Sequence, residues 1–70
     1  MAQLPKAGDT VRARRFHTQG LQTYVISKVL YAAGTDLLVV EGHEDHATRD
    51  ELLMLDLLTV QIVQPADPGY

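Results

Sequence analysis

Cysteine and tryptophan are absent from this 70-residue sequence, and only four residues, one phenylalanine and three tyrosines, are aromatic. Without cysteine, the chain has neither disulfides nor thiolate metal sites, and we expect a cytoplasmic protein. With so few aromatic side chains, a cage for methylated lysine is not expected.

Long apolar runs and glycine clusters are also missing. The longest apolar run, residues 29–33, is far shorter than the roughly 20 residues that a transmembrane helix needs, and residues 1–15 contain no signal-peptide pattern. The five glycines are isolated from one another, which excludes a glycine-rich phosphate loop, and Ser27 lacks the flanking glycines of a nucleophile elbow. We therefore predict that the protein is not an enzyme, uses no cofactor and has no membrane partner.

Positive charge is scarce and unevenly placed. Lysine and arginine total six against nine aspartates and glutamates, for a net charge of −3. Residues 1–35 carry five basic residues and one acidic residue, a balance of +4, whereas residues 36–70 carry one basic and eight acidic residues, a balance of −7. Either the two halves pair their charges within one fold, or the chain presents an oriented surface to a partner.

The apolar pattern predicts a mostly β protein with a single domain, comprising an arm at 1–8, a barrel at 9–63 and a proline-rich tail at 64–70. Residues 10–16 alternate, with Val11 and Ala13 on one face and Arg12 and Arg14 on the other. Residues 21–33 are rich in β-branched and aromatic side chains, which favours a strand, although some of the apolar residues also fall at helical spacing. The polar break at 33–36 before the apolar run 37–40 predicts a β-hairpin, and the charged residues 41–51 indicate a loop.

Segment 49–58 supports two interpretations. Thr48 and Glu51 have the spacing of a capping box, which favours a short helix over 49–58. Such a helix would be apolar on nearly every side, which instead favours a strand at 52–55, a tight turn at 56–58 and a last strand at 59–63. In the second interpretation Leu58, Val60 and Ile62 point inward.

This order of strands resembles an SH3-like small barrel of about five strands, of the Tudor or KOW kind. The residues that carry the resemblance are Gly8-Asp9-Thr10-Val11, Tyr24-Val25-Ile26, Leu37-Leu38-Val39-Val40, and Leu55-Asp56-Leu57-Leu58, where such barrels make one helical turn before the final strand. The resemblance implies a module that binds peptides, modified side chains or nucleic acid, and the fold does not choose among them.

Two short segments are similar to the type II dihydrofolate reductases, which are also SH3-like barrels. Gly8-Asp9-Thr10-Val11-Arg12 is similar to the start of that family, and Val60-Gln61-Ile62 to its substrate-binding strand. Val63 stands where that family has tyrosine, and the middle of the chain does not align, so reductase activity is not expected.

Three groups of residues are candidate sites. The basic residues of the first two predicted strands and the loop between them form a candidate nucleic-acid face: Arg12, Arg14, Arg15, His17 and Lys28. The leucine-rich segment exceeds what one small barrel buries on one side and is a candidate partner interface: Leu52, Leu53, Met54, Leu55, Leu57 and Leu58. His43 and His46 enclose two carboxylates and form either a solvated loop or a weak divalent-metal site, since no helix or knuckle supports them.

We expect a non-enzymatic module that binds a protein partner or its own copy as a homo-oligomer. One alternative is a small nucleic-acid-binding barrel that uses the arginine strand. The other is an acidic inhibitor or mimic from a mobile element, whose acidic half opposes a basic partner.

Overall fold

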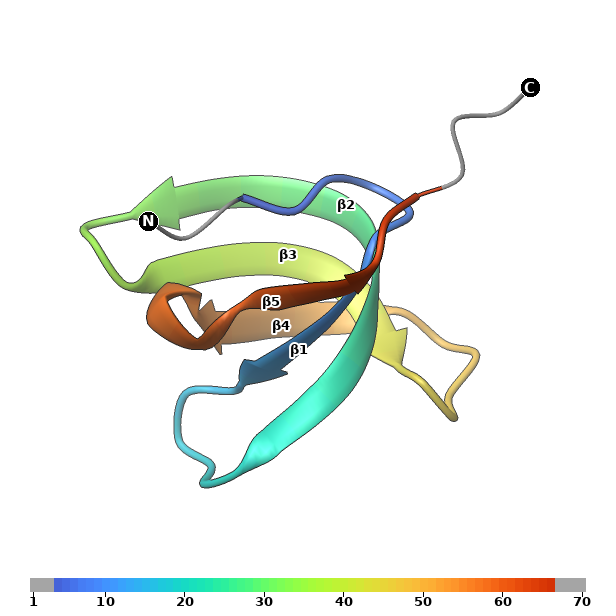
Figure 1. Cartoon of the computed structure of the whole chain (residues 1–70), viewed down its shortest axis with the longest axis horizontal. Coiled ribbons are helices and arrows are strands. Elements are labelled where there is room, and N and C mark those ends of the chain that lie inside the picture. Colours follow the sequence, from blue (N-terminus) through green and yellow to red (C-terminus); the bar gives the residue numbers. More distant parts are fainter. Residues whose placement is uncertain (1–3, 67–70) are drawn as a thin grey trace.

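A computed structural model of the chain describes residues 4–66. The described chain forms one five-stranded antiparallel sheet, as expected of a mostly β protein, with the strands in the order β4-β3-β2-β1-β5 (Figure 1). Its elements are β1 (Thr10–Arg14), β2 (Leu21–Ala33), β3 (Leu37–Glu44), β4 (Glu51–Asp56), the 3₁₀ turn η1 (Leu57–Thr59) and β5 (Gln61–Gln64). The expected arm and tail extend into residues 1–3 and 67–70, which lie outside the described part.

Strand β1 has the alternation that the sequence predicts. Val11 and Ala13 are fully buried, whereas Arg12 is exposed. The strand ends at Arg14, two residues earlier than expected, and Arg15 then forms an isolated bridge with Leu55. The sheet order is therefore open, with one bridge linking its β4 end to the residue after β1.

Strand β2 has the predicted bounds, so the helical interpretation of this segment is wrong. Its first part pairs with β1 and its second part with β3, which makes it the strand around which the sheet bends (Figure 1). Ser27 and Leu30 are extra residues in the pairing with β3, and each is a β-bulge that strengthens the local bend.

The bend brings β2 and β3 very close together. A Cβ atom on Gly42 would overlap the carbonyl oxygen of Val25. Only glycine allows this approach, so Gly42 is needed for its lack of a side chain and not for an unusual backbone angle. Because β3 runs to Glu44, the expected loop at 41–51 is wrong over its first four residues.

Residues 49–58 do not form a helix. Strand β4 covers Glu51–Asp56, and the helical turn is limited to η1. The Asp56 carboxylate caps this turn by accepting a hydrogen bond from the backbone N–H of Leu58, 3.1 Å away. The turn directs Leu58 outward, and its 71% exposed side chain contradicts the predicted inward position.

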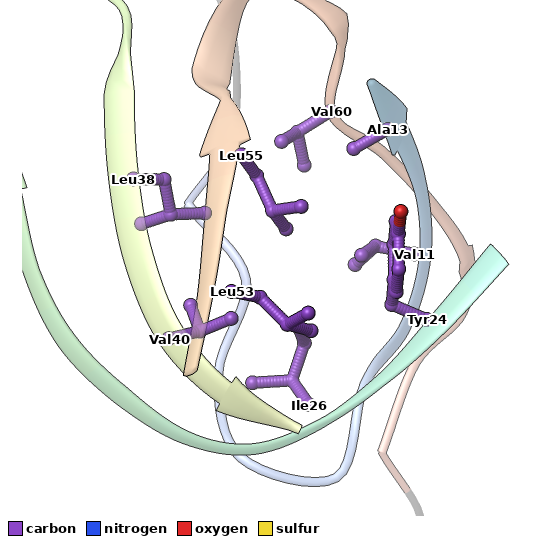
Figure 2. Close-up of a cluster of buried hydrophobic side chains, with 9 residues drawn as sticks. All are labelled: Val11, Ala13, Tyr24, Ile26, Leu38, Val40, Leu53, Leu55 and Val60. Atoms are coloured by element: carbon purple, nitrogen blue, oxygen red, sulfur yellow. The ribbon is translucent and has the colours of Figure 1, made fainter. Parts of the chain in front are cut away.

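The hydrophobic core lies inside the curve of the sheet. Nine side chains point toward one another there: Val11, Ala13, Tyr24, Ile26, Leu38, Val40, Leu53, Leu55 and Val60 (Figure 2). Every strand except β5 contributes to this cluster, and Ile62 of β5 packs against it.

One buried carboxylate ties together the two ends of the described chain. Asp9 is only 2% exposed, and its oxygens accept hydrogen bonds from the backbone N–H groups of Lys6, at 2.9 Å, and Ala66, at 2.6 Å. Its backbone carbonyl accepts the N–H of Ile26 on β2. Asp9 therefore joins the arm, the last described residues and the centre of the sheet.

Candidate interaction surface

The apolar run of β3 has side chains on both faces of the sheet. Leu38 and Val40 belong to the core, so Val39 between them points to the opposite, outer face. In the register, Val39 lies opposite Tyr31 of β2 on one side and Met54 of β4 on the other. Directly opposite residues share a face, so these three side chains form an apolar row across three strands.

Leu52 extends this row along β4. It lies two residues from Met54 and therefore on the same outer face. Tyr31, Leu52 and Met54 are 56%, 57% and 40% exposed, whereas Val39 at their centre is only 2% exposed. We call these four residues the outer apolar face.

The predicted leucine-rich interface is divided by this geometry. Leu53 and Leu55 lie in the core, and Leu57 packs against it. Leu52, Met54 and Leu58 are exposed, but Leu58 lies on η1 and not on the three strands that form the outer apolar face. The structure therefore brings together only two of the six predicted interface residues on this face.

Two residues of the outer apolar face, Tyr31 and Val39, were not among the predicted site residues. The signal for Val39 was present in the uninterrupted run 37–40, because a strand that is apolar at every position has apolar side chains on both faces. The signal for Tyr31 was hidden by the bulges of β2, which change the face to which each residue points.

Opposite charges lie beside the apolar row. Lys28 of β2 and Glu41 of β3 are directly opposite in register, on the same outer face and next to Leu52. Both side chains are exposed, and no ion pair joins them within residues 4–66. Their charges remain available to a molecule that binds this face.

The predicted arginine cluster is largely paired inside the chain. Arg14 contacts Asp56 at 2.6 Å, and its guanidinium also lies over the ring of Phe16. Arg15 contacts Glu51 at 3.0 Å. The two halves of opposite charge are therefore joined within one fold at two points.

The other basic candidates are dispersed. Arg12 lines a shallow hollow together with Glu44, Asp45 and His46, so two acidic residues share its surroundings. His17 is exposed in the β1–β2 loop, with a left-handed backbone at φ 72°. Lys28 pairs in register with β3 and not with β1, so the structure does not bring it beside Arg12.

The Arg15–Glu51 pair also influences a buried tyrosine. Burial removes water from the Tyr24 phenol and raises its pKa above the ordinary 10.0. The positive charge of Arg15 opposes this shift, and the negative charges of Glu44 and Glu51 add to it. The neutral phenol is therefore the favoured form in the folded protein.

The two candidate metal ligands lie in different environments. His43 is half-buried on β3, and its Nδ1 lies 2.8 Å from the carbonyl oxygen of Glu44, whereas His46 is exposed in the following loop. Across residues 4–66, no three histidine, cysteine, aspartate or glutamate side chains gather closely enough to hold a metal ion. The described side chains thus offer a solvated loop at 45–50 and no ready ligand set.

Within the part of the chain that the structure describes, no helix has the length and apolar character needed to cross a membrane. Comparison with protein-family models, curated proteins and solved structures gave no significant match.

Proposed function

We propose that this protein is a non-enzymatic interaction module that binds another protein surface through the outer apolar face. The observation that carries the proposal is the outward row of Tyr31, Val39 and Met54, which lies directly behind the core. Exposed apolar side chains that gather on one face of a small monomer mark an interaction surface more often than a solvated one. A bound partner would remove Tyr31, Leu52 and Met54 from water.

We also propose that the sheet is an SH3-like barrel. Three features favour it: the five strands, the bridge between Arg15 and Leu55, and a helical turn between the last two strands, where the resemblance places one. In such a barrel the outer apolar face would be the outside of three neighbouring strands.

Docking on a face is favoured over pairing at the β5 edge. The pairing of β5 with β1 is interrupted by a bulge at Val63, and β5 is followed by Pro65. A bulge and a nearby proline both hinder the addition of another strand to an edge. The row of side chains across β2, β3 and β4 lies away from both of these features.

The test is site-specific photo-crosslinking in the source cells. A photoreactive amino acid at Leu52 should give a covalent adduct with a protein, which is either a partner or a second copy of this chain. The same amino acid at Leu58 is the matched control, because Leu58 is also exposed but lies on η1. Equal adducts at both positions, or no protein adduct at Leu52, would contradict the proposed function.

A further inference from the structure

The outer apolar face is framed by exposed carboxylates. Glu41 lies on the face itself, beside Leu52 in register. Asp50 lies beyond the start of β4, where it accepts a hydrogen bond of 3.0 Å from the hydroxyl of Ser27 on β2. Asp36 is exposed in the β2–β3 turn at the other end of the same strands. Acidic groups thus lie at both ends of the three strands that form the outer apolar face.

Few positive charges remain to balance these carboxylates. Lys28 is the only lysine or arginine in β2, β3 and β4. Arg14 and Arg15 come from outside these strands, but they are held by Asp56 and Glu51. Arg49, which precedes Asp50 in the loop before β4, is also exposed. The three carboxylates of Asp36, Glu41 and Asp50 therefore outnumber the two basic side chains, Lys28 and Arg49, that lie near this face outside the ion pairs of residues 4–66.

We propose that the segment docking on this face belongs to a different protein and is basic and amphipathic, with apolar side chains flanked by lysine or arginine. This inference rests on the proposed function and names the chemistry of the partner. Apolar side chains of the segment would cover Tyr31, Leu52 and Met54, and its cations would approach Glu41, Asp36 and Asp50.

A second copy of the chain fits this face less well. Two stacked copies would bring the carboxylates of one face toward those of the other, and each chain already carries a net charge of −3. Like charges brought together at an interface oppose association, and near this face only Lys28 and Arg49 offer compensation. The excess of carboxylates around the face therefore favours a basic partner over self-association.

The experiment compares two synthetic amphipathic peptides by their effects on the amide chemical shifts of the full chain. One peptide contains leucine and lysine, and the other has glutamate in place of every lysine. We expect the lysine peptide to shift the amides around Tyr31, Val39 and Met54, with an affinity that falls as salt is added. We expect the glutamate peptide to leave these amides unchanged.

A matched pair of variants tests the charges. Glu41→Gln should weaken binding of the lysine peptide by about three- to fivefold, since it removes one surface charge from the contact. Asp45→Asn changes the net charge by the same amount, but Asp45 lies in the hollow beside Arg12, so it should have a smaller effect. Thermal unfolding of both variants establishes that the fold is retained.

The outcomes separate this inference from the proposed function. Equal binding of both peptides on the outer apolar face would overturn the basic partner and leave the docking face standing. A solution mass that rises with protein concentration, with the same amides shifted, would identify a second copy of the chain as the occupant. That result would also overturn the basic partner and leave the docking face standing. If neither peptide binds, the basic partner is wrong, while crosslinking at Leu52 still decides the proposed function. Shifts elsewhere on the chain, without a protein adduct at Leu52, would overturn both.

Discussion

At the scale of single residues, Asp9 joins residues near both ends of the described chain to β2. Its carboxylate accepts hydrogen bonds from the backbone N–H of Lys6, which lies 3 positions before it, and from that of Ala66, which lies 57 positions after it. Gly8 beside it has a positive φ of 93°, and a Cβ atom there would lie 2.9 Å from the Cβ of Ala66. The Gly8-Asp9 pair that suggested a turn in the sequence is therefore also the point where the chain closes on itself.

The first prediction is that Asp9→Ala lowers the free energy of unfolding by about 2–3 kcal/mol, because it leaves two N–H groups without their charged acceptor. Urea denaturation measures this loss, and hydrogen exchange at Lys6 and Ala66 should accelerate. Asp45→Ala is the control, because its side chain is exposed, and its effect should stay within about 0.5 kcal/mol. If both variants lose the same free energy of unfolding, the hydrogen bonds to the Asp9 carboxylate do not stabilise the fold as predicted.

The second prediction concerns Tyr24 and alkaline pH. Since folding raises the pKa of the phenol, the stability that the neutral form contributes is fully present below pH 10 and is lost as pH rises through the raised value. The unfolding free energy of the wild type should therefore fall above about pH 10, and Tyr24→Phe should make that fall less steep. Tyr31→Phe removes an exposed phenol and should leave the wild-type slope. Urea denaturation across this pH range measures the unfolding free energy of the wild type and both variants. If that free energy falls with pH as steeply in Tyr24→Phe as in the wild type, the prediction is contradicted.

At the scale of elements, the turn η1 is held against β1 by a small polar network. The Arg14 guanidinium contacts Asp56, and the backbone N–H of Arg14 donates to the Thr59 hydroxyl oxygen, 2.9 Å away. The Thr59 hydroxyl in turn donates to the carbonyl oxygen of Asp56 at 2.7 Å. This network fixes the approach of β5 to β1, so the ion pair at its centre acts on the placement of a whole strand.

The third prediction is that the Arg14–Asp56 ion pair has a larger coupling energy than the Arg15–Glu51 ion pair. A double-mutant cycle with Arg14→Met and Asp56→Asn should give a coupling energy of about 1 kcal/mol, since Asp56 is nearly buried and Asn keeps its capping role. The cycle with Arg15→Met and Glu51→Gln should give about 0.3 kcal/mol, because both side chains are substantially exposed. Urea denaturation of the wild type and the six variants measures both coupling energies, and a larger coupling for Arg15 and Glu51 would reverse this ranking.

Most elements could be predicted from the sequence, and the exceptions have physical causes. The alternation of Val11 and Ala13 and the β-rich composition of 21–33 were sufficient for β1 and β2. The helical spacing of Ile26 and Val29 arises because the bulge at Ser27 shifts the phase, so that both residues face the core. The end of β3 was missed because residues 41–44 are polar or glycine, and their pairing with β2 and β4 is not visible locally.

At the scale of the whole molecule, the candidate site could be predicted only in part. The excess of apolar residues in 52–58 was apparent, but deciding which of them face outward requires the register of β4 against β3. The partners of Arg14 and Arg15 lie 42 and 36 positions away, so local sequence could not reveal that this basic cluster is largely neutralised.

The fourth prediction follows from that neutralisation. Light scattering with a mixed oligonucleotide should show no gain in mass at physiological salt, because Arg12 and Lys28 are too few and too far apart for a continuous phosphate contact. A gain at low salt that disappears at high salt would restore the arginine strand as the working face. Substituting alanine at Arg12, Arg14 and Arg15 would then have to abolish it.

The closure at Asp9 also determines how the molecule responds to mechanical load. Thr10 at the start of β1 pairs with Gln64 at the end of β5, so both ends of the described chain leave from the same end of that strand pair. Tension applied through residues 4 and 66 therefore peels β5 from β1 one hydrogen bond at a time, instead of shearing all of the bonds together. The hydrogen bonds from Lys6 and Ala66 to the Asp9 carboxylate are the first to carry that tension. The force at which the sheet begins to open therefore depends on this one side chain.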